Sequence, residues 1–67
     1  MIEVNVNGAA QRLAPDTDIA ALLERLQLAG KRVAVERNGE IVPRGRFEQQ
    51  MLADGDRLEI VVAVGGG

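Results

Sequence analysis

The sequence ends in three consecutive glycines, Gly65, Gly66 and Gly67, directly after an apolar run. Because glycine has no Cβ, we expect residues 65–67 to form a thin, flexible tail with a sterically open carboxylate on Gly67. Such a tail is suited to entering a narrow channel and presenting its carboxylate to another enzyme's active site. Glycine-rich ends without function are also common, and composition alone favours that simpler interpretation.

The residue types that the sequence lacks limit the chemistry that the chain performs by itself. It contains no His, no Cys and no Ser, and only one Thr and one Lys. Disulfide scaffolds, zinc fingers, thiol nucleophiles and Ser-His-Asp triads are therefore excluded. Asp54, Asp56 and Glu59 have the spacing of no established cation loop, and Asp54 to Asp56 is typical of a turn. We expect no catalytic residue, no metal site and no bound cofactor.

Charge and size narrow the class of protein further. The 67 residues carry 8 basic and 10 acidic side chains, a net charge of −2, which disfavours a nucleic-acid binder. The sequence has one loose basic group, Arg44, Arg46 and Arg57. We interpret these residues as solvated surface charges that offset nearby acidic residues. The length allows one small domain with an aliphatic core, since Phe47 is the single aromatic residue. No apolar window is long enough to span a membrane and no signal peptide is present, so we expect a soluble, cytoplasmic protein that contacts no membrane.

The elements that position the tail follow from hydrophobic periodicity. Alternation over residues 1–7 predicts a half-buried strand, Asn7-Gly8 predicts a type I′ hairpin turn, and a second strand runs over about residues 10–13. A helix follows, with Asp16 or Thr17 as its cap and Gly30 as the residue just past its end. Its apolar stripe consists of Ile19, Leu22, Leu23 and Leu26.

The second half of the sequence predicts three more strand segments. Residues 33–37 and 40–42 form a short hairpin around Asn38-Gly39, and residues 57–64 form the last strand. Between them, residues 44–52 are ambiguous, with Phe47, Met51 and Leu52 as candidate anchors to the core. Four apolar residues are candidates for a docking surface near the tail, although ordinary strand composition explains them equally well: Ala34, Val61, Ala63 and Val64.

This order of elements predicts an α+β protein with a β-grasp fold. We expect a mixed sheet of four to five strands with one main helix packed on one face. The first and last strands are the most apolar, so they belong at the centre of the sheet, where the crossing connection allows them to be parallel. The domain comprises residues 1–64 and the tail residues 65–67.

Three segments of the sequence resemble the ubiquitin-like sulfur carriers of thiamine biosynthesis, the ThiS family. Residues 5–8 are similar to the family's opening hairpin and residues 33–44 to its most recognisable internal stretch. Residues 54–67 are similar to its final turn, strand and tail. The resemblance covers the whole chain.

The resemblance implies a function for Gly67. An E1-like, ThiF-like adenylating enzyme uses ATP to convert the Gly67 carboxylate to an acyl adenylate, and sulfur from a persulfide donor displaces AMP to leave a thiocarboxylate. Gly65, Gly66 and Gly67 enter the partner active sites. A ThiG-like thiazole synthase takes the sulfur into the thiazole phosphate of thiamine. The chain is then a cosubstrate, not an enzyme, and a monomer suits it best.

Two other interpretations stay open. The small subunit of molybdopterin synthase, or another sulfur carrier, has the same fold and tail chemistry but a different sulfur acceptor. A non-covalent β-grasp adaptor is an alternative of another class, and in it the glycine tail would be dispensable.

Overall fold

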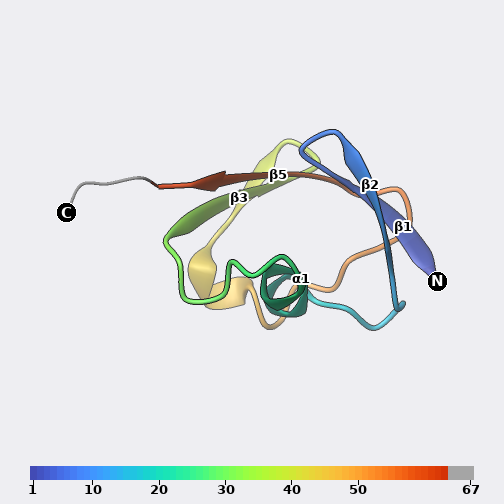
Figure 1. Cartoon of the computed structure of the whole chain (residues 1–67), viewed down its shortest axis with the longest axis horizontal. Coiled ribbons are helices and arrows are strands. Elements are labelled where there is room, and N and C mark those ends of the chain that lie inside the picture. Colours follow the sequence, from blue (N-terminus) through green and yellow to red (C-terminus); the bar gives the residue numbers. More distant parts are fainter. Residues whose placement is uncertain (64–67) are drawn as a thin grey trace.

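Five strands form one mixed sheet, and a helix and a 3₁₀ turn cover one of its faces (Figure 1). The computed structural model describes residues 1–63. The elements in chain order are β1 (Ile2–Val6), β2 (Ala9–Leu13), α1 (Ile19–Arg25), β3 (Val33–Arg37), β4 (Glu40–Val42), η1 (Arg44–Arg46) and β5 (Arg57–Val62). The strand order across the sheet is β2-β1-β5-β3-β4. The α+β, β-grasp prediction is confirmed.

Strand β5 lies at the centre of the sheet, as its apolar sequence predicts. It is parallel to β1, with Asn5 opposite Arg57 and Val6 opposite Leu58. On its other side it is antiparallel to β3. Val33 lies opposite Val62 at one end of this pairing, and Arg37 lies opposite Leu58 at the other end. The remaining strands, β2 and β4, are the sheet edges.

Both Asn-Gly pairs form the tight turns that the sequence predicts. Asn7 and Gly8 have φ angles of 52° and 88°, and Asn38 and Gly39 have 51° and 88°. Positive φ at both central residues is the signature of a type I′ turn, whose twist matches that of the flanking strands. The two hairpins, β1–β2 and β3–β4, are therefore fixed by local sequence.

Helix α1 begins two residues later than a cap at Asp16 would require. Asp18 is the N-cap, and its carboxylate accepts a hydrogen bond from the Ala21 N–H at 2.7 Å. The N–H groups of Ile19 and Ala20 donate to the carbonyl oxygens of Gln50 and Phe47. All three free N–H groups of the first turn are thus satisfied, two of them by a distant segment that a local pattern does not reveal.

The end of α1 also differs from the prediction. The helix ends at Arg25, and Gln27, not Gly30, is the residue past its end, with a φ of 62°. The Leu28 N–H donates to the Leu23 carbonyl at 2.7 Å and the Gln27 N–H to the Glu24 carbonyl at 3.0 Å, which together form a Schellman motif. Leu28 packs against the core beyond this turn, so the helix closes early.

The core lies between the sheet and α1. Ile19, Leu22 and Leu23 of the helix are buried, and Leu26 is half-buried, as the apolar stripe predicts. The other buried hydrophobic residues come from the inner face of the sheet and from the segment after η1: Val4, Val6, Leu13, Val35, Phe47, Leu52, Leu58 and Ile60. Within residues 1–63 no helix is long and apolar enough to cross a membrane.

Residues 44–52 resolve into η1 and a connection that anchors through two side chains. Phe47 and Leu52 are buried, which confirms those two anchors. Met51 is 45% exposed, so its predicted role as an anchor is wrong. Its backbone forms an isolated antiparallel bridge with Asp18, which turns the Met51 side chain out of the core.

Candidate functional site

The predicted reactive tail begins beyond the part of the chain that the structure describes. Val64, Gly65, Gly66 and Gly67 lie outside residues 1–63, so the tail and its Gly67 carboxylate stay predictions. What the structure does describe is the strand that leads to them. The Ala63 N–H donates to the Arg32 carbonyl at 2.8 Å, so the chain is tied to the sheet as far as residue 63.

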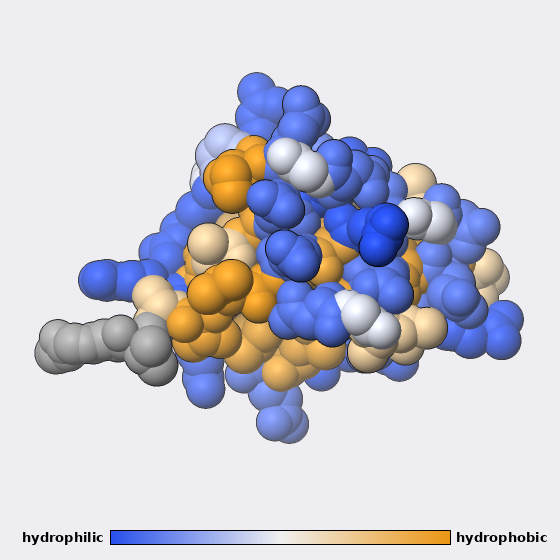
Figure 2. Space-filling model, turned by 90° about the horizontal axis from the view of Figure 1, so that it is seen from above, coloured by the Kyte–Doolittle hydropathy of each residue, from blue (hydrophilic) through white to orange (hydrophobic). Residues whose placement is uncertain are grey.

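The candidate docking residues lie together on the sheet face that α1 does not cover. Ala34 and Val61 are direct partners across β3 and β5, and both are exposed, Val61 by 63%. Ala63 is exposed further along the chain. Figure 2 shows this face from above, with hydrophobic surface gathered where β5 ends. The structure therefore brings three of the four predicted docking residues to one surface.

Sequence reasoning missed one member of this apolar surface. Ile41 on β4 is 67% exposed and pairs with Glu36 of β3, so it projects on the same open face. Its strand has only three residues, too short for alternation to assign a face. Val62 alternates with Val61 and so lies on the inner side of β5, but it is 38% exposed, because it lies at the end of the strand opposite the half-buried Val33.

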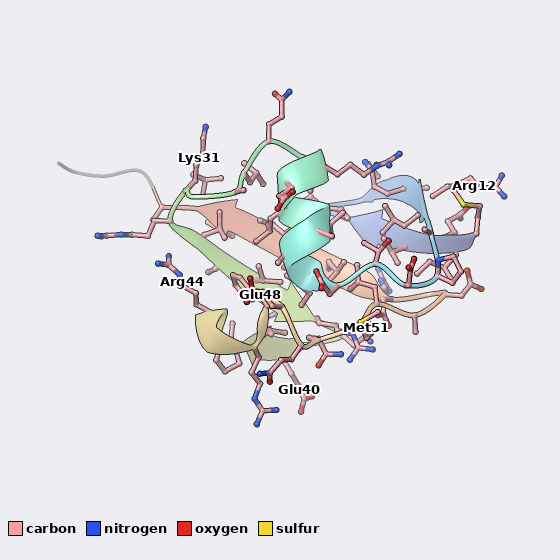
Figure 3. All side chains as sticks on the ribbon, turned by 90° about the horizontal axis from the view of Figure 1, so that it is seen from below. Arg12, Lys31, Glu40, Arg44, Glu48 and Met51 are labelled. Carbon is pink, nitrogen blue, oxygen red and sulfur yellow. The ribbon has the colours of Figure 1, made fainter. Side chains whose placement is uncertain are left out.

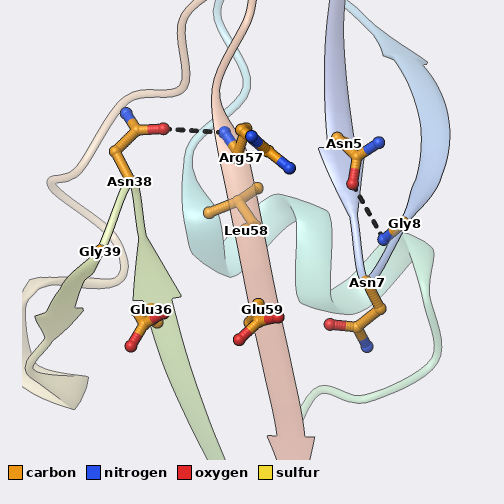
Figure 4. A pocket seen from close by; sticks show the side chains of 9 residues that line it. All are labelled: Asn5, Asn7, Gly8, Glu36, Asn38, Gly39, Arg57, Leu58 and Glu59. Carbon is orange, nitrogen blue, oxygen red and sulfur yellow. Dashed lines mark hydrogen bonds between the residues drawn. The ribbon is translucent and has the colours of Figure 1, made fainter.

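Further along the same face, a broad concavity lies between the two hairpin turns (Figure 4). Glu36 and Glu59 line it side by side, because they are direct cross-strand partners on β3 and β5. Arg57 of β5 and Asn5 of β1 line its other parts. This area is polar, whereas the end of the face nearest residue 63 is apolar.

Two asparagine side chains bind β5 from either side. Asn7 accepts a hydrogen bond from the Ile60 N–H at 2.8 Å and donates to the Ile60 carbonyl at 3.0 Å, so it extends the β1–β5 pairing beyond the backbone of β1. Asn38 accepts from the Arg57 N–H at 2.9 Å. These asparagines therefore serve both as turn residues and as clamps on the strand that leads to the tail.

Among residues 1–63, Asp56 is the charged residue that is buried, with 5% of its surface exposed. Its carboxylate accepts four hydrogen bonds, from Arg37 Nε and Nη2, from Asn38 Nδ2 and from the Ala53 N–H. Burial acts to raise the pKa of Asp56, but these hydrogen bonds and the positive charge of Arg37 outweigh it, so the pKa lies below its ordinary value of 3.8. Asp56 fixes the start of β5 against the β3–β4 hairpin.

The loose basic group of the sequence does not come together. Arg57 lines the concavity on the open face, whereas Arg44 lies on the helix-bearing side with Lys31 and Glu48 (Figure 3). Within residues 1–63, no group of three or more acidic side chains is placed to hold a metal ion. The described part of the chain thus presents an exposed apolar area on the open face of the sheet and a well-anchored strand β5.

Comparison with known proteins gives consistent similarities. The model of the ThiS family matches residues 4–67. The chain is 43% identical over 65 residues to "Sulfur carrier protein ThiS" of Bacillus subtilis, covering 96% of this chain and 98% of that protein. The crystal structure of a thiamine biosynthesis protein (ThiS) from Geobacter metallireducens superposes with a TM-score of 0.82 at 33% identity, over 98% of this chain and 100% of that one.

Similarity also extends to a larger protein. The chain is 44% identical over 62 residues to a thiazole synthase of Paramagnetospirillum magneticum. That match covers 92% of this chain but 19% of the synthase, so the chain spans about a fifth of the length of that relative.

Proposed function

The chain belongs to the ThiS family, and from that premise we propose that it is a sulfur carrier of thiamine biosynthesis whose reactive group is the carboxylate of Gly67. The observation that carries this proposal is the match to the family over residues 4–67, which includes the three terminal glycines. The 43% identity to the carrier of Bacillus subtilis over nearly the full length of both proteins supports it.

The proposed chemistry has three steps. The Gly67 carboxylate attacks the α-phosphate of ATP in an E1-like enzyme, which releases pyrophosphate and leaves an acyl adenylate. The terminal sulfur of a persulfide donor then attacks the acyl carbon and displaces AMP. A thiol finally attacks the donor's inner sulfur and breaks the S–S bond that the persulfide brought. The thiol and the donor become a disulfide, and the thiocarboxylate remains on Gly67. Adenylation supplies the leaving group that a carboxylate lacks, and glycine has no Cβ to obstruct attack.

The chain's own contribution is to present the tail. Strand β5 is held at the centre of the sheet by β1, β3 and the clamps of Asn7 and Asn38. Residue 63 is tied to Arg32, so we expect the tail to leave the domain beyond that point. The ATP belongs to the partner, and we propose that the chain acts as a cosubstrate of partner enzymes.

We expect thiazole synthase to be the sulfur acceptor, since a thiazole synthase contains a segment 44% identical to this chain. A protein that carries both segments would hold donor and acceptor together. We expect the chain to be a cytoplasmic monomer that binds its partner enzymes one after the other.

The test of the tail chemistry is the intact mass of the protein after incubation with ATP, the adenylating enzyme and a persulfide donor. We expect a gain equal to one sulfur atom replacing one oxygen atom, localised to Gly67. Deletion of Gly67, or Gly66→Leu, should abolish the gain while leaving the far-UV circular dichroism unchanged. An unmodified mass with a partner that modifies another carrier would refute the proposal and favour a non-covalent adaptor.

We also propose that Ala34, Val61, Ala63 and Val64 dock on the adenylating enzyme. Val61→Asp should weaken binding in a titration, because it places a charge in the apolar part of the open face. Ala10→Asp is the matched control, since Ala10 pairs with Asn5 and is exposed on the far strand β2. Equal affinity of both variants would refute this surface.

A further inference from the structure

Two carboxylates of the open face are placed directly against one another. Glu36 of β3 and Glu59 of β5 are cross-strand partners. Their sequence neighbours Val35, Leu58 and Ile60 are buried toward α1, so both glutamates project on the open face. Figure 4 shows the two carboxylates next to each other. Like charges directly opposite each other in a sheet repel and lower its stability.

Neither carboxylate forms an ion pair within the described part of the chain. The salt bridge found among residues 1–63 joins Arg37 to Asp56. Arg37 follows Glu36 along β3, so its side chain projects on the opposite face of the sheet. Arg57 lines the same concavity two residues before Glu59, but it forms no ion pair with either glutamate. Within residues 1–63 no ion pair compensates the two charges, which in the free protein are screened by water, by salt and by the nearby Arg57.

The surroundings of the pair are apolar on two sides. Ile41 of β4 is the cross-strand partner of Glu36, and the exposed pair Ala34–Val61 is the next to project on the same face. A partner that covers these apolar side chains also covers the carboxylates and removes them from water. Two carboxylates buried in this way cost free energy unless a cation accompanies them.

We infer that the adenylating partner inserts one basic side chain, surrounded by apolar residues, between Glu36 and Glu59. This inference rests on the proposed function and specifies the chemistry of its docking surface. Charge complementarity selects a cation. Glu59 lies on β5, the strand that leads to the tail, and Glu36 lies directly across from it on β3, so we expect a tail-binding partner to cover both. The two carboxylates repel in the free carrier and share a cation in the complex, so the same pair lowers stability and raises affinity.

The experiment uses the full chain and measures both properties. Glu36→Gln and Glu59→Gln remove one charge each and keep the side-chain shape, and Glu24→Gln on the exposed face of α1 is the matched control. We expect each of the first two to bind the adenylating enzyme about tenfold more weakly, with a smaller dependence of affinity on salt. We expect their melting temperatures to rise by about 1–6 °C, because the repulsion is gone. Glu24→Gln should change neither property.

The outcomes separate this inference from the proposed function. If the wild-type chain gains sulfur and the Glu36→Gln and Glu59→Gln variants bind as tightly as it does, the inference is wrong and the sulfur-carrier function stands. If the variants bind tighter, the partner presents a negative or neutral surface and the inference is also overturned. If the wild-type chain neither binds nor is modified, both proposals fail together.

Discussion

Replacing Asp56 with Asn should destabilise this domain strongly, although the two side chains have almost the same shape. In the native protein the two carboxylate oxygens accept four hydrogen bonds at 2.8–3.3 Å. Asparagine retains one acceptor oxygen, and its NH₂ group would face two of those donors. A hydrogen bond to a charged group contributes roughly 1.5–3 kcal/mol.

The expected loss is smaller than two such bonds would suggest. The Arg37 side chain is 27% exposed, so water partly replaces its lost partner. We therefore expect the free energy of unfolding to fall by about 2–4 kcal/mol. A domain of this length has a total of only about 3–10 kcal/mol, so the melting temperature should fall by roughly 10–30 °C.

The assay is thermal and urea unfolding followed by far-UV circular dichroism, since the chain has no Trp or Tyr to report by fluorescence. Asp54→Asn is the matched control, because Asp54 lies in the same turn, is exposed, and accepts one hydrogen bond, from the Glu3 N–H, that an asparagine oxygen also accepts. A loss for Asp56→Asn no larger than that for Asp54→Asn would refute the reasoning.

The effect of Asp56 should also depend on pH in a defined direction. Its pKa is lowered in the folded state, so it contributes stability above its ordinary pKa of 3.8 and loses that contribution as the pH falls from 3.8 through the lowered value. The difference between wild type and Asp56→Asn should therefore shrink below that pH. A difference of constant size across this range would show that the charge of Asp56 is not the cause.

Two further predictions concern residues at positive φ. Asn7→Gly keeps the turn but removes both hydrogen bonds to Ile60, and we expect a loss of about 1–2 kcal/mol in urea unfolding; an unchanged midpoint would contradict the clamp. Gln27→Gly should instead stabilise the protein by about 0.5–1 kcal/mol, because glycine adopts the φ of 62° without strain, and a lower melting temperature would contradict this account of the helix end.

Much of the fold could be predicted from the sequence because its signals are local. Alternation in β1 and β5 and the two Asn-Gly pairs determine the strands, the hairpins and the faces on which Val61 and Ala34 lie. The apolar character of the first and last strands was enough to place them side by side in the centre of the sheet.

The features that sequence reasoning missed depend on contacts between distant segments. The N-terminus of α1 is completed by carbonyl groups of residues 47 and 50, which favours Asp18 as the cap. The local sequence predicts only that Asp56 lies in a turn. Its carboxylate is buried because Arg37 and Asn38, which are 19 and 18 residues earlier in the chain, pack against it and donate hydrogen bonds to it. Ile41 lies on a three-residue strand, where periodicity carries no information about the face.

The parallel arrangement of β1 and β5 has a mechanical consequence. A force applied to the chain beyond residue 63 acts along the axis of β5. The neighbouring strands β1 and β3 run alongside this axis, so the force is perpendicular to the hydrogen bonds that join them to β5. Four hydrogen bonds join Asn5 and Asn7 to this part of the chain. The Asn5 N–H donates to the Asp56 carbonyl, the Asn7 N–H donates to the Leu58 carbonyl, and the Asn7 side chain forms two bonds with Ile60. These bonds are then loaded together in shear and are not opened one after another. Sheared bonds share the force. If a partner enzyme draws in the end of the chain as proposed, the force would be spread over the sheet, and we expect the domain to move as one rigid body without unfolding.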